Sequence, residues 1–216
     1  MDNLLYLDEV FTSIQGESTD AGLPCTFVRL FGCHIGCTYC DQPQDPKNRK
    51  RISIGNLVSK IQKSGVKYVC ITGGEPMNQW NALYPLVLEL VSLGYKVSIE
   101  TSGCVPIETD PYNRSFKYIM DIKCPSSGVA EKNIFDNLMN LQAKDEVKFV
   151  VADEVDYKFM RKVLMRYPTQ AKILVSPCFT PDFKPMIGEE LVQWLLRDRL
   201  HHVRVQIQLH KVIGVR

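Results

Sequence analysis

The feature that most constrains the fold is a regular alternation between short β-branched runs and stretches with helical spacing. Such alternation is typical of βαβ units, in which parallel strands are joined by helices. Six runs are predicted to be strands: Thr26–Phe31, Tyr68–Thr72, Lys96–Thr101, Lys117–Ile122, Glu146–Val151 and Lys172–Ser176. Helices are predicted at Ile54–Lys63, Ala82–Leu93, Ile134–Leu141, Val155–Tyr167 and Ile187–Leu196, with a late strand or extended tail at Val203–Leu209.

The length of the chain favours a single domain spanning residues 1–216. The stretch from Thr101 to Lys123 contains Pro106 and Pro111 and shows no helical periodicity. Because proline removes a backbone donor and breaks helix interiors, this crossover is predicted not to be a regular helix. The elements fit either an open doubly wound sheet or a partial α/β barrel with six core strands and a reduced set of helices.

Polar signatures follow the ends of four predicted strands. They are Gly32–Cys40, Gly73–Pro76, Ser102–Gly103 and Lys123. In parallel α/β folds, ligands bind at the carboxyl ends of the strands. We therefore expect these segments to meet at one rim and to form a single active site.

The loop Cys33-His34-Ile35-Gly36-Cys37-Thr38-Tyr39-Cys40 places three thiols within eight residues. Three thiolates can hold three irons of a cubane cluster and leave the fourth iron open to a substrate or cofactor. The competing interpretation is zinc, with His34 as a fourth ligand. However, structural zinc sites often use two Cys-x-x-Cys pairs, and no second pair follows. The loop therefore favours a 4Fe-4S cluster.

The other five cysteines, at positions 25, 70, 104, 124 and 178, are scattered and are interpreted as small hydrophobic residues. The N-terminus shows no basic region followed by a long apolar segment. No apolar run approaches the roughly 20 residues that span a bilayer. We therefore expect a cytoplasmic protein with reduced thiols and no membrane partner.

The charge of the chain gives no sign of a nucleic-acid partner. A net charge of +2 results from 26 basic and 24 acidic residues. Two basic runs, Lys47–Arg51 and His201–Arg204, do not interleave with aromatic residues. They are interpreted as solvated loop charge.

The Cys-x3-Cys-x2-Cys loop resembles that of the radical S-adenosylmethionine superfamily. Gly73-Gly74-Glu75-Pro76, Glu100-Thr101-Ser102-Gly103 and Asp121-Ile122-Lys123 look like strand ends that the superfamily uses to hold this cofactor. The resemblance implies a partial, open parallel α/β barrel. It also implies a set of S-adenosylmethionine-binding residues: Tyr39, Gly74, Glu75, Thr101, Ser102, Lys123, Pro125, Ser126 and Ser127.

Within that superfamily, both ends of the chain are similar to the 7-carboxy-7-deazaguanine synthases. The similarity lies in Phe11–Glu17, which precedes Phe27-Val28-Arg29-Leu30, and in Gln208-Leu209-His210-Lys211 near the terminus. It implies a lyase of deazapurine and queuosine precursor biosynthesis. Its substrate would be 6-carboxy-5,6,7,8-tetrahydropterin, whose ring contracts with loss of ammonia after a 5′-deoxyadenosyl radical removes a hydrogen atom.

The N-terminal segment and the C-terminal tail are expected to form the substrate pocket. The implied substrate-binding residues are Ile14, Gln15, Gly16, Glu17, Arg29, Thr72, His210 and Arg216. Arg29 offers a bidentate partner for a carboxylate, and Gln15 and Glu17 can pair with an aminopyrimidinone edge. Taken singly, Arg29 could form a strand-end salt bridge, Glu17 a helix cap and His210 a packing contact.

Two further expectations concern single residues. The terminal carboxylate of Arg216 is expected to accept hydrogen bonds from the pterin. After the third cysteine the family usually reads Asp followed by Thr or Ser, whose hydroxyl helps to bind magnesium. This chain reads Asp41-Gln42, so Gln42 is expected to replace the usual magnesium ligand, and magnesium dependence is doubtful.

Other functions remain open from the sequence. A glycyl-radical-enzyme activase would use the same cysteine loop without a carboxylate pocket, and a zinc-stabilised binding module would have no catalysis. An electron donor such as flavodoxin or ferredoxin is expected as a partner, and a homodimer is possible.

Overall fold

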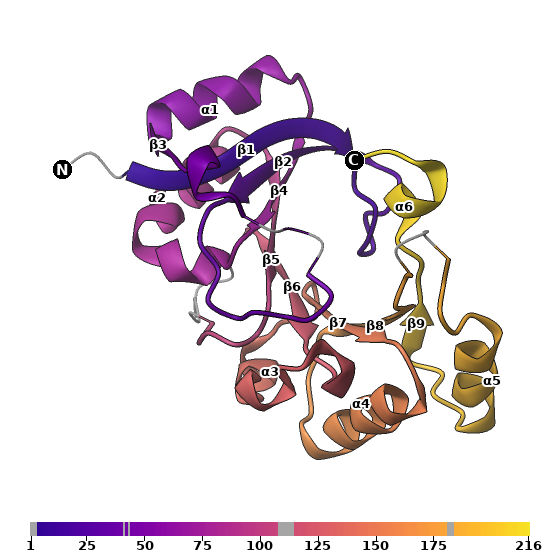
Figure 1. Cartoon of the computed structure of the whole chain (residues 1–216). Coiled ribbons are helices and arrows are strands. Elements are labelled where there is room, and N and C mark those ends of the chain that lie inside the picture. The colour runs from indigo at the N-terminus through magenta and orange to yellow at the C-terminus, as the bar shows by residue number, and fades with distance from the viewer. Residues whose placement is uncertain (1–3, 41, 43, 108–114, 181–183) are drawn as a thin grey trace.

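The computed structural model of the chain describes residues 4–40, 42, 44–107, 115–180 and 184–216. Within these residues, nine strands form one sheet in the order β3-β1-β2-β4-β5-β6-β7-β8-β9 (Figure 1). β1 pairs antiparallel with β2 and β3, and every later pair is parallel. The sheet curves into an open wall, and the described residues of its edge strands β3 and β9 do not pair with each other. The predicted open parallel α/β fold is confirmed.

The strands are β1 (Leu4–Ile14), β2 (Pro24–Leu30), β3 (Lys50–Ser53), β4 (Tyr68–Gly73), β5 (Lys96–Thr101), β6 (Lys117–Ile122), β7 (Glu146–Val151), β8 (Lys172–Pro177) and β9 (Val203–Val205). The helices are α1 (Ile54–Lys63), α2 (Trp80–Ser92), α3 (Asn137–Asn140), α4 (Glu154–Arg166), α5 (Glu189–Arg197) and α6 (Leu209–Ile213). Short 3-10 turns cover Pro46–Asn48, Pro76–Gln79, Pro125–Ser127 and Ala130–Lys132. All six predicted core strands are present.

The main differences from the sequence prediction lie at the two ends and at one crossover. Strands β1 and β3 were not predicted. The helix expected at Ile134–Leu141 shortens to the four residues of α3, and Val203–Leu209 divides between β9 and the start of α6. Between β5 and β6, residues 102–107 and 115–116 contain no helix, as predicted. Pro111 lies outside the described residues.

The two basic runs were expected in loops, and this expectation is wrong in part. Lys50 and Arg51 belong to β3, and Arg204 belongs to β9. Both strands form edges of the sheet. Charged side chains on an edge strand oppose pairing with another chain, so these charges protect the two edges of the sheet from such pairing.

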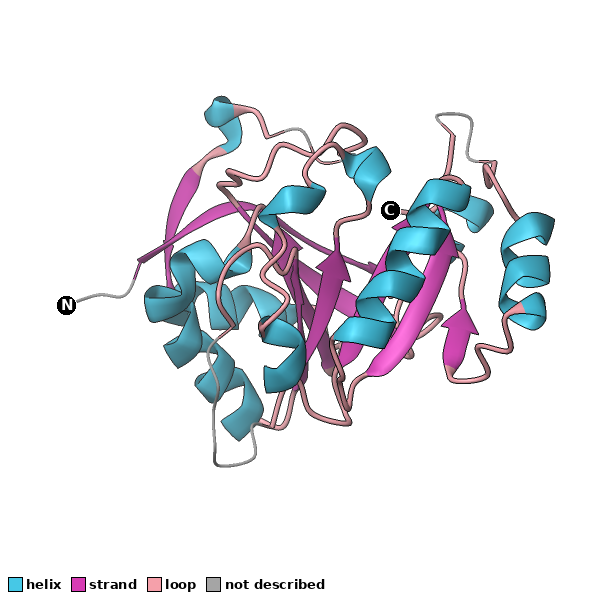
Figure 2. Ribbon diagram, turned by 90° about the horizontal axis from the view of Figure 1, so that it is seen from below, coloured by secondary structure: helices cyan, strands magenta, loops and turns pink. Residues whose placement is uncertain are grey.

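The hydrophobic core lies between the convex face of the sheet and the outer helices (Figure 2). Helix α1 is capped by the preceding residue Ser53, whose hydroxyl accepts a hydrogen bond from the Asn56 amide. A serine cap of this kind satisfies one of the free amides of the first turn. Helix α2 then buries Leu83, Leu86, Val87 and Leu90 against the sheet. Within the described residues, no helix is long and apolar enough to cross a membrane.

Strand β7 is buried along its whole length, yet its two faces differ. Val147, Phe149 and Val151 join the main hydrophobic core. Because successive side chains of a strand alternate between faces, Glu146 and Lys148 point to the opposite, concave side. The concave side of the sheet therefore carries buried charge.

Candidate active site

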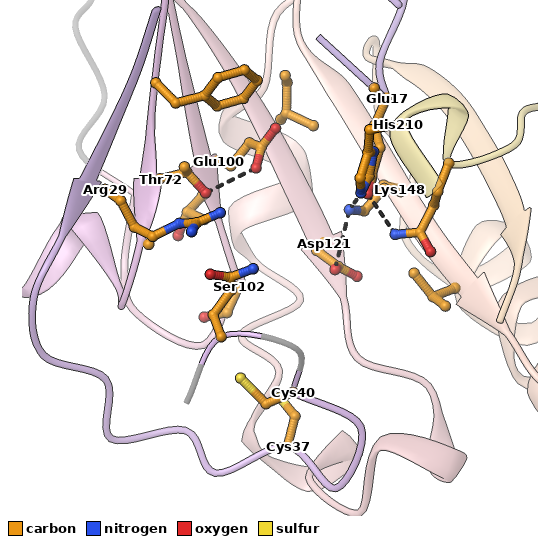
Figure 3. Close-up of a pocket in the computed structure, with 18 of the residues that line it drawn as sticks. Glu17, Arg29, Cys37, Cys40, Thr72, Glu100, Ser102, Asp121, Lys148 and His210 are labelled. Carbon is orange, nitrogen blue, oxygen red and sulfur yellow. Dashed lines mark hydrogen bonds and ion pairs between the residues drawn. The ribbon is translucent and has the colours of Figure 1, made fainter. Parts of the chain in front are cut away.

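A cavity of about 270 Å³ opens at the concave side of the sheet. Its walls come from the ends of β1, β2, β4, β5 and β6, from β7, and from the C-terminal tail (Figure 3). Cys33, Cys37 and Cys40 line the same cavity. The structure thus brings together the cysteine loop and both ends of the chain, as the sequence predicts.

The cysteine loop rests on the turn that follows β6. The Thr38 amide donates to the Ser127 carbonyl at 2.9 Å, and the Thr38 hydroxyl donates to the Ser126 carbonyl at 2.9 Å. The Lys132 ammonium donates to the Ile35 carbonyl at 2.6 Å. Pro125, Ser126 and Ser127 are not among the cavity-lining residues. In this structure Ser126 and Ser127 support the loop, and the contact of all three residues with a cofactor stays a prediction.

The donor set suits a cluster because three free thiols share one loop and one cavity. Cys33 and Cys40 are exposed, and Cys37 is partly buried. Among the described residues, no three Cys, His, Asp or Glu side chains converge on a single metal ion. A cubane cluster binds each thiolate to a different iron, so its ligands need not converge on one point. His34, the alternative zinc ligand, lies 3.0 Å from the Asn78 amide nitrogen.

Two glycines at the end of β4 pack directly against the start of the cysteine loop. A Cβ atom on Gly74 would lie 2.1 Å from the Gly32 carbonyl oxygen, and one on Gly73 would lie 2.5 Å from the Leu30 carbonyl oxygen. The Gly74 amide donates to Leu30 at 2.8 Å, and the Glu75 amide donates to Gly32 at 2.9 Å. Glycine is needed here because two backbone segments touch, which fixes the loop on the sheet.

Glu75 is buried and fully engaged with the ends of neighbouring strands. Its carboxylate accepts from the Thr101 hydroxyl at 2.7 Å, from the Ser102 amide at 2.8 Å and from the Ser102 hydroxyl at 2.5 Å. It also accepts from the Met77 amide at 3.1 Å. Glu75 therefore ties the end of β4 to the end of β5. Its predicted contact with S-adenosylmethionine stays a prediction.

A polar wall on one side of the cavity is centred on Glu100. Its carboxylate accepts from the Thr72 hydroxyl at 2.9 Å and from the Gln15 amide at 3.3 Å. Gln15 is buried, and its carbonyl oxygen accepts from the Glu17 amide at 3.1 Å. The segment after β1 is thereby hydrogen-bonded to the ends of β4 and β5.

The opposite wall is built around the ion pair between Glu17 and Lys148. The two charged atoms are 2.5 Å apart, and Gln208 donates to the second Glu17 oxygen at 2.6 Å. Burial raises the pKa of Glu17, but Lys148, Gln208 and His210 outweigh it, so the pKa falls to about 2. Burial lowers the pKa of Lys148, but Glu17, Asp121 and Glu100 together hold it well above its usual value. Both groups are therefore charged at neutral pH.

His210 lies against the backbone of Gly16. A Cβ atom at Gly16 would lie 1.9 Å from the His210 Nδ1 atom. The Leu209 amide donates to the Gly16 carbonyl at 2.8 Å. The glycine at position 16 therefore makes room for the imidazole and joins the tail to the N-terminal segment.

Arg29 projects into the cavity from β2 (Figure 3). Its Nη1 atom lies 2.5 Å from a Glu9 carboxylate oxygen, so the strand-end salt bridge considered from the sequence does form. Its Nε atom is buried and has no hydrogen-bond partner among the described residues. The guanidinium therefore keeps at least one donor, the Nε–H group, without a protein partner among the described residues. Arg216 lines the same cavity and also contacts Glu9.

The cavity collects most of the predicted site residues: Ile14, Gln15, Gly16, Glu17, Arg29, Cys33, Cys37, Tyr39, Cys40, Gln42, Thr72, Gly74, Glu75, Thr101, Ser102, Lys123, His210 and Arg216. Asp41 lies outside the described residues. The residues that the prediction missed include Phe11, Phe27, Lys148, Cys178, Phe179 and Gln208. A lysine between the apolar residues Val147 and Phe149 of a predicted strand was the available signal for Lys148, because a buried charge needs a partner.

The sequence and the fold of the chain are similar to those of known proteins. The model of the Radical SAM superfamily matches residues 28–110. The chain is 39% identical to the 7-carboxy-7-deazaguanine synthase of Methanospirillum hungatei, over 98% of this chain and 86% of the relative. It is 36% identical to the synthase of Koribacter versatilis, over 97% of this chain and 96% of the relative. The crystal structure of QueE from Escherichia coli matches with a TM-score of 0.76 and 22% identity, covering 96% of this chain and 95% of that chain, which shows the fold.

We predict that Gly16→Ala destabilises the protein by forcing His210 out of place. Overpacking of this kind typically costs about 1–3 kcal/mol in the free energy of unfolding, measured by chemical denaturation. In a His210→Gly background the cost should largely disappear, because the clashing side chain is absent. Gly55→Ala is the matched control, since a Cβ there meets nothing within 4 Å. Equal costs of Gly16→Ala in both backgrounds would contradict the prediction.

We predict that Lys148→Met destabilises the protein by about 3–5 kcal/mol at neutral pH, because Glu17 becomes a buried charge without its cation. The pKa of Glu17 is about 2 when folded against 4.5 for the free side chain. The stabilisation by the pair is therefore complete above about pH 5 and is lost as the pH falls toward 2. Denaturation from pH 3 to 8 should show the difference between wild type and variant narrowing in acid.

The control for this prediction is Lys158→Met, which removes an exposed pair with Glu154. Exposed pairs contribute about 0–1 kcal/mol. A difference between wild type and Lys148→Met that does not change with pH would show that Glu17 is not the group involved.

Proposed function

The chain belongs to the 7-carboxy-7-deazaguanine synthase family, and we propose that it catalyses the reaction for which these relatives are named. The reaction converts 6-carboxy-5,6,7,8-tetrahydropterin to 7-carboxy-7-deazaguanine with loss of ammonia. The observation that carries the proposal is the shared cavity. The cysteine loop, Arg29 and the Glu17–Lys148 pair all line it.

The residues present fit a 4Fe-4S cluster and S-adenosylmethionine. Cys33, Cys37 and Cys40 would hold the cluster through three irons. The strand ends at Gly74, Thr101–Ser102 and Lys123 would hold the cofactor beside it, and Tyr39 also lines the cavity. When bound, these groups supply a radical that removes one hydrogen atom from the substrate.

Substrate recognition follows from the charges and hydrogen-bonding groups of the two walls. The unpaired Nε–H donor of Arg29 suits the substrate carboxylate. Gln15, Glu17 and His210 offer both donors and acceptors to the aminopyrimidinone edge, and Lys148 keeps Glu17 ionised as an acceptor. Ile14, Gly16 and Thr72 complete the contact surface, and Arg216 borders it.

The size and lining of the cavity favour a small molecule over a glycyl-radical partner protein. An activase needs no pocket for a small carboxylate, whereas here Arg29, Glu17 and Gln15 line one cavity. A donor protein such as flavodoxin or ferredoxin would supply the electron that the reaction requires.

The test of the proposed function is an anaerobic assay of the reconstituted enzyme with the carboxylated tetrahydropterin. We expect 7-carboxy-7-deazaguanine and ammonia in equal amounts, detected by mass spectrometry and an ammonia assay. Cys33→Ala, Cys37→Ala and Cys40→Ala should each abolish cleavage of S-adenosylmethionine and the visible absorption of the cluster. Cys104→Ala and Cys178→Ala should preserve both. A Cys37→Ala enzyme with full iron content and turnover would refute the assignment.

Magnesium is the group for which the residues at the site do not match the family pattern. Gln42 lines the cavity in place of a short hydroxyl side chain. Magnesium prefers hard oxygen ligands in a near-ideal octahedron at about 2.0–2.1 Å, and the longer Gln42 side chain can instead donate its amide N–H groups to the substrate carboxylate. We therefore propose that Gln42 takes the place of the metal.

We predict that turnover persists after thorough chelation, with little stimulation when magnesium is added back. The Gln42→Thr variant, which restores the hydroxyl, should become more dependent on magnesium. A saturable stimulation of the wild-type enzyme of about tenfold, or about 1.4 kcal/mol of transition-state stabilisation, would contradict the proposal.

A further inference from the structure

We infer that Glu9 is a positioning residue for Arg29, and that the Arg216 side chain holds Glu9 in that role. The inference rests on the proposed function, because it assigns the means by which Arg29 recognises the substrate carboxylate. It concerns three side chains from the N-terminal strand, its neighbour and the C-terminal tail.

The register of β1 places Glu9 directly opposite Arg29. The pairing of β1 with β2 shifts between Leu7 and Glu9, and after this irregularity Glu9 faces Arg29 and Phe11 faces Phe27. Bulges of this kind occur at barrel rims and re-aim side chains. Opposed charges on neighbouring strands interact directly, and the Nη1–Oε1 distance is 2.5 Å.

Arg216, from the C-terminal tail, packs along three side chains of β1, those of Glu9, Phe11 and Ser13. Its Nη2 atom donates to the second carboxylate oxygen of Glu9, and its guanidinium carbon lies 4.5 Å from the centre of the Phe11 ring. The Ser13 hydroxyl donates to the Arg216 carbonyl oxygen at 2.6 Å. Residues 9, 11 and 13 share one face of the strand because side chains alternate. Figure 1 shows the end of the tail beside the end of β1.

The consequence is a division of the Glu9 carboxylate between two guanidinium groups. One oxygen accepts from Arg29 and the other from Arg216. A carboxylate otherwise tends to pair with arginine through two parallel hydrogen bonds, which would occupy a second donor of Arg29. With its second oxygen taken by Arg216, Glu9 anchors Nη1 alone. The buried Nε atom of Arg29 stays without a partner, and its edge is kept for the substrate carboxylate.

Glu9 and Arg216 can fix the orientation of the Arg29 guanidinium because Arg29 is largely enclosed by the protein. Its side chain is 17% exposed and that of Glu9 is 27% exposed. The Arg29 guanidinium carbon also lies 5.0 Å from the centre of the Phe11 ring, and Phe11 stacks on Phe27 with the ring centres 5.0 Å apart. One side of the guanidinium is therefore packed and one of its nitrogens is anchored, while Arg29 as a whole lines the cavity.

The test compares the binding of two reduced pterins to the reconstituted enzyme with S-adenosylmethionine and without reductant, so that no turnover occurs. One pterin is 6-carboxy-5,6,7,8-tetrahydropterin, and the other is the same tetrahydropterin without the carboxylate. The dissociation constant of the pterin without the carboxylate, divided by that of the carboxylated pterin, measures how strongly the enzyme recognises the carboxylate. We expect Glu9→Gln and Arg216→Met each to reduce this ratio by about tenfold, with little change for the pterin that lacks the carboxylate. The double variant should lose no more than Glu9→Gln alone, because both changes act through Arg29.

Several outcomes would overturn the inference. If Arg29 acted only as a positive charge, removing the negative charge of Glu9 would raise the ratio instead. A purely structural role would weaken the binding of both pterins equally. The Arg216→Met variant is expected to fold normally, since the Arg216 side chain is 63% exposed, so its effect does not come from misfolding. Asp8→Asn is the control for loss of a carboxylate on the same strand. A wild-type enzyme that fails to prefer the carboxylated pterin would refute the proposed function, whereas preserved ratios in the variants would refute the positioning role alone.

Discussion

The buried ion pair between Glu17 and Lys148 joins parts of the chain that are 131 residues apart. It connects the segment after β1 to the middle of β7, and through Gln208 it also connects the C-terminal tail. Burying two charges costs several kcal/mol for each ion unless geometry and further hydrogen bonds compensate. That compensation requires Glu17, Lys148 and Gln208 to be in place together. The pocket wall therefore forms only when both ends of the chain are docked on the sheet.

The cysteine loop depends on a different constraint, the close contact of two backbone segments. Gly73 and Gly74 touch the residues at the end of β2. Across the contact, the Gly74 and Glu75 amides donate to the carbonyls of Leu30 and Gly32. From the sequence, these glycines were interpreted as a surface that approaches a ligand. The structure adds a second reason for them, because any side chain at Gly74 would displace the loop that carries Cys33. This one contact therefore fixes the cysteine loop on the end of β4.

The sequence predicted the parallel strands well because each contains a short run of buried, mostly apolar residues, such as Val69–Ile71. It failed for β1, although β1 is the longest strand. The two faces of β1 meet different surroundings: Leu5 and Leu7 are buried in the core, whereas Glu9, Phe11 and Ser13 face the cavity or the tail. The shift of register near Asp8 also interrupts the alternation. Lys148 was missed for a related reason, since its partner Glu17 lies far away in sequence.

The polar groups of the cavity are nearly all paired, and the exceptions carry information. Buried polar atoms in native proteins are almost always hydrogen-bonded. Among the described residues that line the cavity, two buried side-chain atoms have no partner, the Arg29 Nε donor and the Asp121 Oδ1 acceptor. Lys123 and Lys148 approach the other oxygen of Asp121, at 3.0 Å and 3.5 Å. Glu75, Glu17 and Glu100 each accept hydrogen bonds from protein groups, so the walls of the cavity are held in place by the protein itself. Arg29 Nε and Asp121 Oδ1 are therefore the two buried side-chain atoms of the described lining whose hydrogen-bonding capacity the protein does not use.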